Sequence, residues 1–137
     1  MIGNVVVDAS VALAWVLPAE DTDQALALRN IALEDLQVTL IVPPNFWYEV
    51  ANVLWVAVRR QRLNRHDALK AMRLLIDFEC MVWKANPENC LKLSIEHDLA
   101  VYDTAYLDLA MEKQAALWTM DQALKRAAVK AGIKVLP

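Results

Sequence analysis

The segment Val5-Val6-Val7-Asp8-Ala9-Ser10 joins three β-branched apolar residues to an abrupt polar break. Taken from Ile2, the run Ile2–Val7 is typical of a short strand that is buried on both faces of a sheet. The apolar run Val11–Leu17 follows directly and stops at Pro18, which predicts a short helix. A buried strand that leads straight into a helix is the unit from which α/β proteins are built.

The same alternation continues along the whole chain. Apolar runs predict strands over Val38–Val42, Cys80–Trp83, Ala115–Thr119 and Ile133–Leu136. Helical patterns predict helices over Asp21–Leu36, Asn45–Arg60 with Asn45 as N-cap, Asn64 or Asp67 to about Phe78, Asn86 to about His97, Tyr102–Gln114, and Asp121–Ala131 ended by Gly132. We therefore expect an α/β fold, in which helices cover both faces of a mostly parallel sheet of about five short strands.

Length and composition limit the class of protein. The 137 residues suit one domain, and no linker or shift in composition divides them, so residues 1–137 are expected to form a single domain. With 58% apolar and 23% charged residues, the chain is too apolar to be disordered. The net charge of −3 excludes a protein that is basic over its whole surface, but it permits a local basic strip.

The sequence predicts a cytoplasmic protein. The longest uninterrupted apolar run is Val11–Leu17, whereas a membrane span needs about 18 residues or more. The N-terminus lacks the basic start of a signal peptide. Cys80 and Cys90 have neither metal-binding nor CxxC spacing, so we expect both to be reduced and buried.

Four carboxylates stand at the ends of predicted elements. Asp8 and Asp121 each follow a strand, Asp103 begins a helix, and Glu49 lies about one turn into the helix after the second strand. In open parallel sheets, ligands bind beyond the carboxyl ends of the strands. Taken singly, each aspartate has an alternative role as the N-cap of a helix. Glu49 has no such alternative: its neighbours are apolar, the helix is expected to be buried on most sides, and a carboxylate near a core needs a partner or a proton.

Four acids gathered at one edge would repel one another unless a cation lay between them. A divalent cation removes that repulsion, and a site built from carboxylates without His or Cys favours Mg²⁺ or Mn²⁺ over Zn²⁺. Such ions serve phosphoryl chemistry because they activate water and neutralise phosphate charge.

The motifs resemble those of one family when they are taken in order. They are Val5-Val6-Val7-Asp8-Ala9-Ser10, Pro43-Pro44 ahead of Glu49-Val50-Ala51-Asn52-Val53-Leu54, Tyr102-Asp103-Thr104-Ala105-Tyr106-Leu107-Asp108-Leu109-Ala110, and Leu117-Trp118-Thr119-Met120-Asp121, with Ile133-Lys134-Val135 closing the chain. Each motif alone is weak, but the order and the separations resemble those of PIN domains over the whole chain. In size the chain is most similar to the VapC toxins of type II toxin–antitoxin pairs.

The resemblance implies a PIN-like α/β/α sandwich and a ribonuclease that depends on Mg²⁺ or Mn²⁺. It implies that Asp8, Glu49, Asp103 and Asp121 hold the metal directly or through water, and that metal-bound hydroxide attacks the RNA phosphodiester. Ser10 and Thr119 match positions where the family often carries a hydroxyl near the site. Capping roles are equally open for both residues. Ser10 could be the capping hydroxyl of the first helix, and Thr119 could form a capping box with Gln122.

The resemblance also implies partners. VapC proteins are usually homodimers, and the C-terminal segment of a VapB-like antitoxin lies in an apolar groove and often points a basic side chain into the acidic pocket. A mean hydropathy of +0.26 fits a buried interface. Candidates to line such a groove, near the helices of Asp21–Leu63, are Trp15, Phe46, Trp47, Tyr48 and Trp55, although core positions are the alternative for most of them.

RNA contact requires positive charge, and two clusters are candidates. One is Arg59, Arg60, Arg62 and Arg65, for which a solvated helix end is the alternative. The other is Lys125 and Arg126, with Lys130 on the same predicted helix. Asp108 lies five residues after Asp103, about 140° away around the helix, and is not expected in the site.

Other classes fit less well. A haloacid-dehalogenase-type phosphatase needs a second Asp two residues after the first, where this chain has Ser10. A receiver domain needs adjacent acids and a late lysine, which the sequence does not offer. A catalytically weak PIN domain that serves for binding or dimerisation is the alternative within the family.

Overall fold

A five-stranded sheet forms the centre of the computed structural model, which describes residues 3–17 and 21–137. Its strands are β1 (Asn4–Val7), β2 (Thr39–Val42), β3 (Met81–Val82), β4 (Ala116–Trp118) and β5 (Val135–Leu136), in the order β3-β2-β1-β4-β5. Every neighbouring pair is parallel. The expected fold class is thus confirmed.

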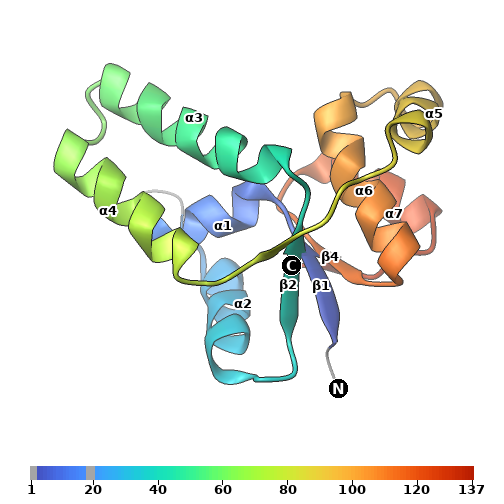
Figure 1. Cartoon of the computed structure of the whole chain (residues 1–137), viewed down its shortest axis with the longest axis horizontal. Coiled ribbons are helices and arrows are strands. Elements are labelled where there is room, and N and C mark those ends of the chain that lie inside the picture. Colours follow the sequence, from blue (N-terminus) through green and yellow to red (C-terminus); the bar gives the residue numbers. More distant parts are fainter. Residues whose placement is uncertain (1–2, 18–20) are drawn as a thin grey trace.

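Seven helices in the described residues cover the sheet. They are α1 (Ala9–Val16), α2 (Asp23–Glu34), α3 (Asn45–Arg59), α4 (Arg65–Ile76), α5 (Pro87–His97), α6 (Val101–Lys113) and α7 (Gln122–Lys130). Figure 1 shows α1–α4 to one side of the strands and α5–α7 to the other. Layers of helices on both sides explain why the strands read as apolar runs rather than as alternating patterns.

The first strand lies in the middle of the core. Val5, Val6 and Val7 have no exposed surface, and Val6 pairs with Ile41 on one side and Leu117 on the other. β1 therefore has a strand on each edge and helices over each face. Because all the strands are parallel, their carboxyl ends meet at one edge of the sheet, where Asp8 follows β1 and Asp121 follows β4 by three residues.

Several element ends differ from those predicted. Asn45 is not the N-cap of α3; Pro44 is the cap and Asn45 is the first residue of the helix. α1 begins at Ala9 rather than at Val11 because Asp8 accepts a hydrogen bond from the Val11 amide. Of the two caps proposed for α4, the structure uses Asn64.

The remaining caps and boundaries follow the sequence closely. Asn86 caps α5 and Asp121 caps α7, as expected, and Gly132 follows α7 with a positive φ of 77°. Ile2 and Pro18, used to bound the first strand and the first helix, lie outside the described residues. No helix in the described ranges is long and apolar enough to cross a membrane.

Candidate active site

Asp8 is a buried carboxylate that is held by several donors. Only 6% of the residue is exposed. Its Oδ1 accepts hydrogen bonds from the Ser10 hydroxyl at 2.5 Å and from the Val11 amide at 3.2 Å, and its Oδ2 accepts one from the Thr119 hydroxyl. Burial raises the pKa of Asp8 despite these donors. Its charge is therefore costly in the absence of a cation.

Two hydroxyls tie the end of β1 to the segment after β4. The Met120 amide donates to the Ser10 oxygen at 3.0 Å, and the Asp121 amide donates to the Thr119 oxygen at 3.0 Å. The capping roles considered for these hydroxyls are wrong, because the Asp8 carboxylate caps α1 and Asp121 caps α7. Ser10 and Thr119 instead fix the Asp8 carboxylate.

Glu49 reaches the same edge from α3 and is half-buried. Its Oε1 accepts a hydrogen bond from Asn45 Nδ2 at 2.5 Å, and its Oε2 accepts one from the Tyr106 hydroxyl at 2.9 Å. Burial raises the pKa of Glu49, and the negative charges of Asp103 and Asp8 raise it further. The Tyr106 hydrogen bond joins Glu49 to α6, the helix that also carries Asp103.

Asp103 and Asp121 complete the group of acids. Asp103 is in the first turn of α6 but does not cap it, since Ala100 holds the cap position. Burial raises the pKa of Asp103, and the charge of Asp121 raises it further. Asp121 itself is exposed and accepts a hydrogen bond from the Leu124 amide at 3.0 Å. The capping alternative thus applies to Asp8 and Asp121 and fails for Asp103.

The chemistry of this donor set fits a hard divalent cation. All the atoms that could bind the cation are carboxylate oxygens. Burial raises the pKa values of Asp8, Glu49 and Asp103, and neighbouring negative charge, which a cation would offset, further raises those of Glu49 and Asp103. In the described part of the chain, no three His, Cys, Asp or Glu side chains approach closely enough to enclose a metal as they stand. Water would therefore have to complete the coordination, as is usual for Mg²⁺.

Asn45 and Tyr106 belong to the site, although the sequence pattern does not single them out for it. The position of Asn45 predicts a helix cap, and Tyr106 is one residue within a longer motif. The helical spacing offered one indication, because residues three and four positions apart share a face, as do Asp103 and Tyr106 on α6 and Asn45 and Glu49 on α3. The pairing of Tyr106 with Glu49 joins two different helices and has no such local pattern.

Comparison with known proteins supports the relationship that the geometry suggests. The PIN domain family matches residues 5–130 of the chain. A ribonuclease VapC3 from Pyrobaculum aerophilum is 33% identical over 125 residues, which cover 88% of this chain and 92% of that protein. The chain belongs to the PIN domain family.

Solved structures share this PIN fold. PAE2754 from Pyrobaculum aerophilum superimposes with a TM-score of 0.74 at 20% identity, covering 97% of this chain and 83% of that one. VapC20 from Mycobacterium tuberculosis, a toxin that cleaves the sarcin-ricin loop, gives a TM-score of 0.67 at 16% identity, covering 97% and 99%. At these identities the likeness concerns the fold.

The two basic clusters lie in different parts of the PIN domain. The turn between α3 and α4, which carries Arg60 and Arg62, lies at the end of these helices remote from the strands in Figure 1. Arg59 stacks over the ring of Trp55 at 5.4 Å. Lys125 and Arg126, in contrast, follow Asp121 within about one turn of α7. This second cluster is therefore the nearer one to the acids along the chain.

The helix α3 is amphipathic rather than buried on most sides, which corrects the sequence expectation. Phe46 is buried, whereas Tyr48 is 80% and Trp55 is 56% exposed. Of the aromatic residues proposed for a groove, Trp15 and Phe46 belong to the core.

An apolar groove of about 270 Å³ does lie between α3 and α4, lined by Ala51, Leu54, Trp55, Val58, Arg65, Ala68, Leu69 and Met72.

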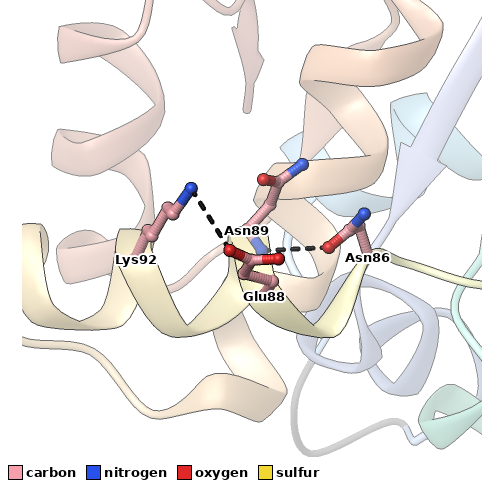
Figure 2. A network of polar contacts seen from close by, with 4 residues as sticks. All are labelled: Asn86, Glu88, Asn89 and Lys92. Atoms are coloured by element: carbon pink, nitrogen blue, oxygen red, sulfur yellow. Dashed lines mark hydrogen bonds and ion pairs between the residues drawn. The ribbon is translucent and has the colours of Figure 1, made fainter.

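A larger hollow, of about 880 Å³, lies between the start of α5 and the second half of α6. Its buried acid, Asp108, accepts a hydrogen bond from the Asn86 amide at 2.8 Å. Figure 2 shows the start of α5, where Asn86 accepts from the Asn89 amide at 3.1 Å and Lys92 pairs with Glu88 at 3.6 Å. These polar groups serve the start of the helix, so we assign Asp108 a structural role.

Proposed function

We propose that this PIN domain is a metal-dependent endoribonuclease that acts in the cytoplasm as the toxin of a toxin–antitoxin pair. The observation that carries the proposal is the gathering of buried or half-buried acids with raised pKa values beyond the ends of β1 and β4. A ribonuclease relative at 33% identity and a toxin of the same fold support it.

Asp8, Glu49, Asp103 and Asp121 are the residues that would hold Mg²⁺ or Mn²⁺, directly or through water. When bound, such an ion activates water and offsets the charge of the scissile phosphate. The chain itself contributes the orientation of these acids. Ser10, Thr119 and the Val11 amide fix the Asp8 carboxylate, so little reorganisation is needed when the substrate arrives.

The RNA backbone would be held by basic residues near the acids. Lys125 and Arg126 are the preferred candidates because they follow Asp121 on α7. Arg59, Arg60, Arg62 and Arg65 are remote candidates, suited to a longer RNA that extends along the α3–α4 hairpin. A net charge of −3 makes such local positive charge necessary for phosphate contact.

The apolar groove between α3 and α4 suits an amphipathic segment of a VapB-like antitoxin. Leu69 and Trp55 offer exposed apolar surface there, and Arg65 is the charged residue among those that line the groove. The same groove is the observation that favours the alternative, a catalytically weak domain used for binding. A small DNA-binding protein encoded just upstream would identify the partner and support the toxin function.

The test compares three forms of the chain, expressed without an antitoxin. Wild type, Asp8→Asn and Asp108→Asn are incubated with total RNA in Mg²⁺, in Mn²⁺ and in EDTA. Asp108→Asn is the matched control, because Asp108 is as buried as Asp8 (5% against 6% exposed) but lies outside the group of acids. Both substitutions keep an oxygen that can accept the local backbone hydrogen bond.

We expect discrete, metal-dependent cuts with wild type and Asp108→Asn, and none with Asp8→Asn at equal folded fraction. End mapping of the cuts would then give the RNA target. If the folded wild type cuts no RNA over a range of metal concentrations, the binding function replaces the proposed one. Equal loss in both variants would show that the effect of Asp8 is structural.

A further inference from the structure

The Glu49 carboxylate is held by donors from two different helices. Asn45 on α3 donates to Oε1 at 2.5 Å, and Tyr106 on α6 donates to Oε2 at 2.9 Å. Tyr106 is only 1% exposed, so its hydroxyl depends on this hydrogen bond for a partner. The Asn45 amide also lies 3.5 Å from the Tyr102 carbonyl oxygen on α6.

These contacts join elements that do not pack along their lengths. In Figure 1, α3 runs away from the strands on one side, and α6 lies on the other. Within the described residues, the hydrogen bonds that link α3 to α6 are those of Asn45 with Tyr102 and of Tyr106 with Glu49. Tyr106 also shares a face of α6 with Asp103, so it sets Glu49 and Asp103 in a fixed relation.

We infer that Tyr106 and Asn45 are positioning residues, which orient the Glu49 carboxylate toward the divalent cation; this inference rests on the proposed function. Each carboxylate oxygen can accept about two hydrogen bonds, so one donor on each oxygen leaves room for a cation or its water. A side chain that filled the core without this role would need no hydroxyl, because the phenylalanine ring occupies the same volume apart from one oxygen atom.

The test measures Mn²⁺ binding as well as activity. Tyr106→Phe removes the hydroxyl and Asn45→Ala removes the amide, and Tyr48→Phe is the matched control because it makes the same chemical change at an 80% exposed position. Mn²⁺ affinity is measured by calorimetry on each purified chain, RNA cleavage is measured against Mn²⁺ concentration, and stability is measured by urea unfolding in EDTA.

We expect Tyr106→Phe and Asn45→Ala each to weaken Mn²⁺ binding by about 10- to 100-fold, the range for residues that orient metal ligands. Saturating Mn²⁺ should restore most of the cleavage, and Tyr48→Phe should behave as wild type. If Tyr106→Phe does not fold, Asn45→Ala decides.

Two results would overturn the inference in distinguishable ways. If wild type binds Mn²⁺ and cuts RNA but both variants retain its Mn²⁺ affinity, Tyr106 and Asn45 only stabilise the fold. If wild type neither binds Mn²⁺ nor cuts RNA, the proposed function itself fails and the inference fails with it.

Discussion

At the scale of single residues, Asp8 combines two tasks that usually oppose each other. It caps α1 through the Val11 amide, which stabilises the fold, and it carries a charge in a buried position, which costs stability. Its raised pKa shows that burial outweighs the donors around it. A residue that is kept in such a position without a cation destabilises the protein whenever it is ionised.

This balance predicts how stability changes with pH in metal-free protein. A raised folded-state pKa means that the folded state holds the proton more tightly than the unfolded chain does, so stability is lost as pH rises from the ordinary value of 3.8 through the raised pKa. Asp8→Asn removes that loss while keeping a good cap. We expect the free energy of unfolding of the variant to increase relative to that of wild type as pH rises. The gain should be about 1.4 kcal/mol for each unit by which the folded-state pKa of Asp8 exceeds its ordinary value.

Urea unfolding of both proteins in EDTA, from pH 4 to pH 8, measures this difference. Asp103, whose pKa is raised by burial and by Asp121, gives the same trend in both proteins. The Asp8 charge also raises the pKa of Glu49, so the difference between the two proteins measures Asp8 together with its effect on Glu49. Parallel stability curves for the two proteins would contradict the prediction.

At the scale of elements, α7 shows how one acid can serve both a helix and a reaction. The Asp121 carboxylate accepts a hydrogen bond from the Leu124 backbone amide at 3.0 Å. The backbone amide of Asp121 donates to the Thr119 hydroxyl, and this hydroxyl donates to the Asp8 carboxylate. The start of α7 is therefore connected to the end of β1 through Thr119. The role of Asp121 as a helix cap and its role in RNA cleavage can be separated by a substitution that keeps the cap but removes the charge.

We expect Asp121→Asn to retain stability and to lose RNA cleavage, because Asn caps as well as Asp but carries no charge. Asp121→Ala should lose both, with about 1 kcal/mol less free energy of unfolding. Thr22→Ala is the control, since Thr22 caps α2 through the Ala25 amide and is not among the acids or their donors. It should cost about as much stability and leave cleavage per folded molecule unchanged. Full cleavage by Asp121→Asn would assign Asp121 to capping alone.

At the scale of the whole molecule, apolar side chains remain exposed on several helices. Tyr48 at 80%, Ile95 at 76% and Leu69 at 60% are examples, Leu36 in the turn after α2 is 99% exposed, and the mean hydropathy is +0.26. A chain of this size gains by covering such surface in an interface. The proposed antitoxin would cover the α3–α4 groove, and we expect a second copy of the chain to cover other apolar surface.

Light scattering on the purified chain should therefore give twice the chain mass of 15.5 kDa. Leu69→Glu, which puts a charge in the α3–α4 groove, should leave this mass unchanged and should weaken capture of the partner. The mass of a single chain at every concentration tested would contradict the expected dimer, and loss of the dimer in Leu69→Glu would reassign the groove to it.

The alternation of strands and helices, the parallel sheet and the order of the four acids follow from the amino-acid sequence alone. These features depend on local patterns: apolar β-branched runs mark buried strands, and Asn86 and Asp121 mark helix starts within a few residues of the chain. The acids Asp8 and Asp121 could be placed because parallel strands end at one edge.

The side chains that meet at this edge of the sheet are brought together by tertiary packing. Thr119 reaches Asp8 across 111 positions of the sequence, and Tyr106 reaches Glu49 across 57. Tertiary packing also decides that Tyr48 is exposed while Phe46, two residues earlier on α3, is buried. Such outcomes depend on which helix face lies against the sheet and which helix crosses its end. Local patterns do not contain that information, because it follows from the packing of segments distant along the chain.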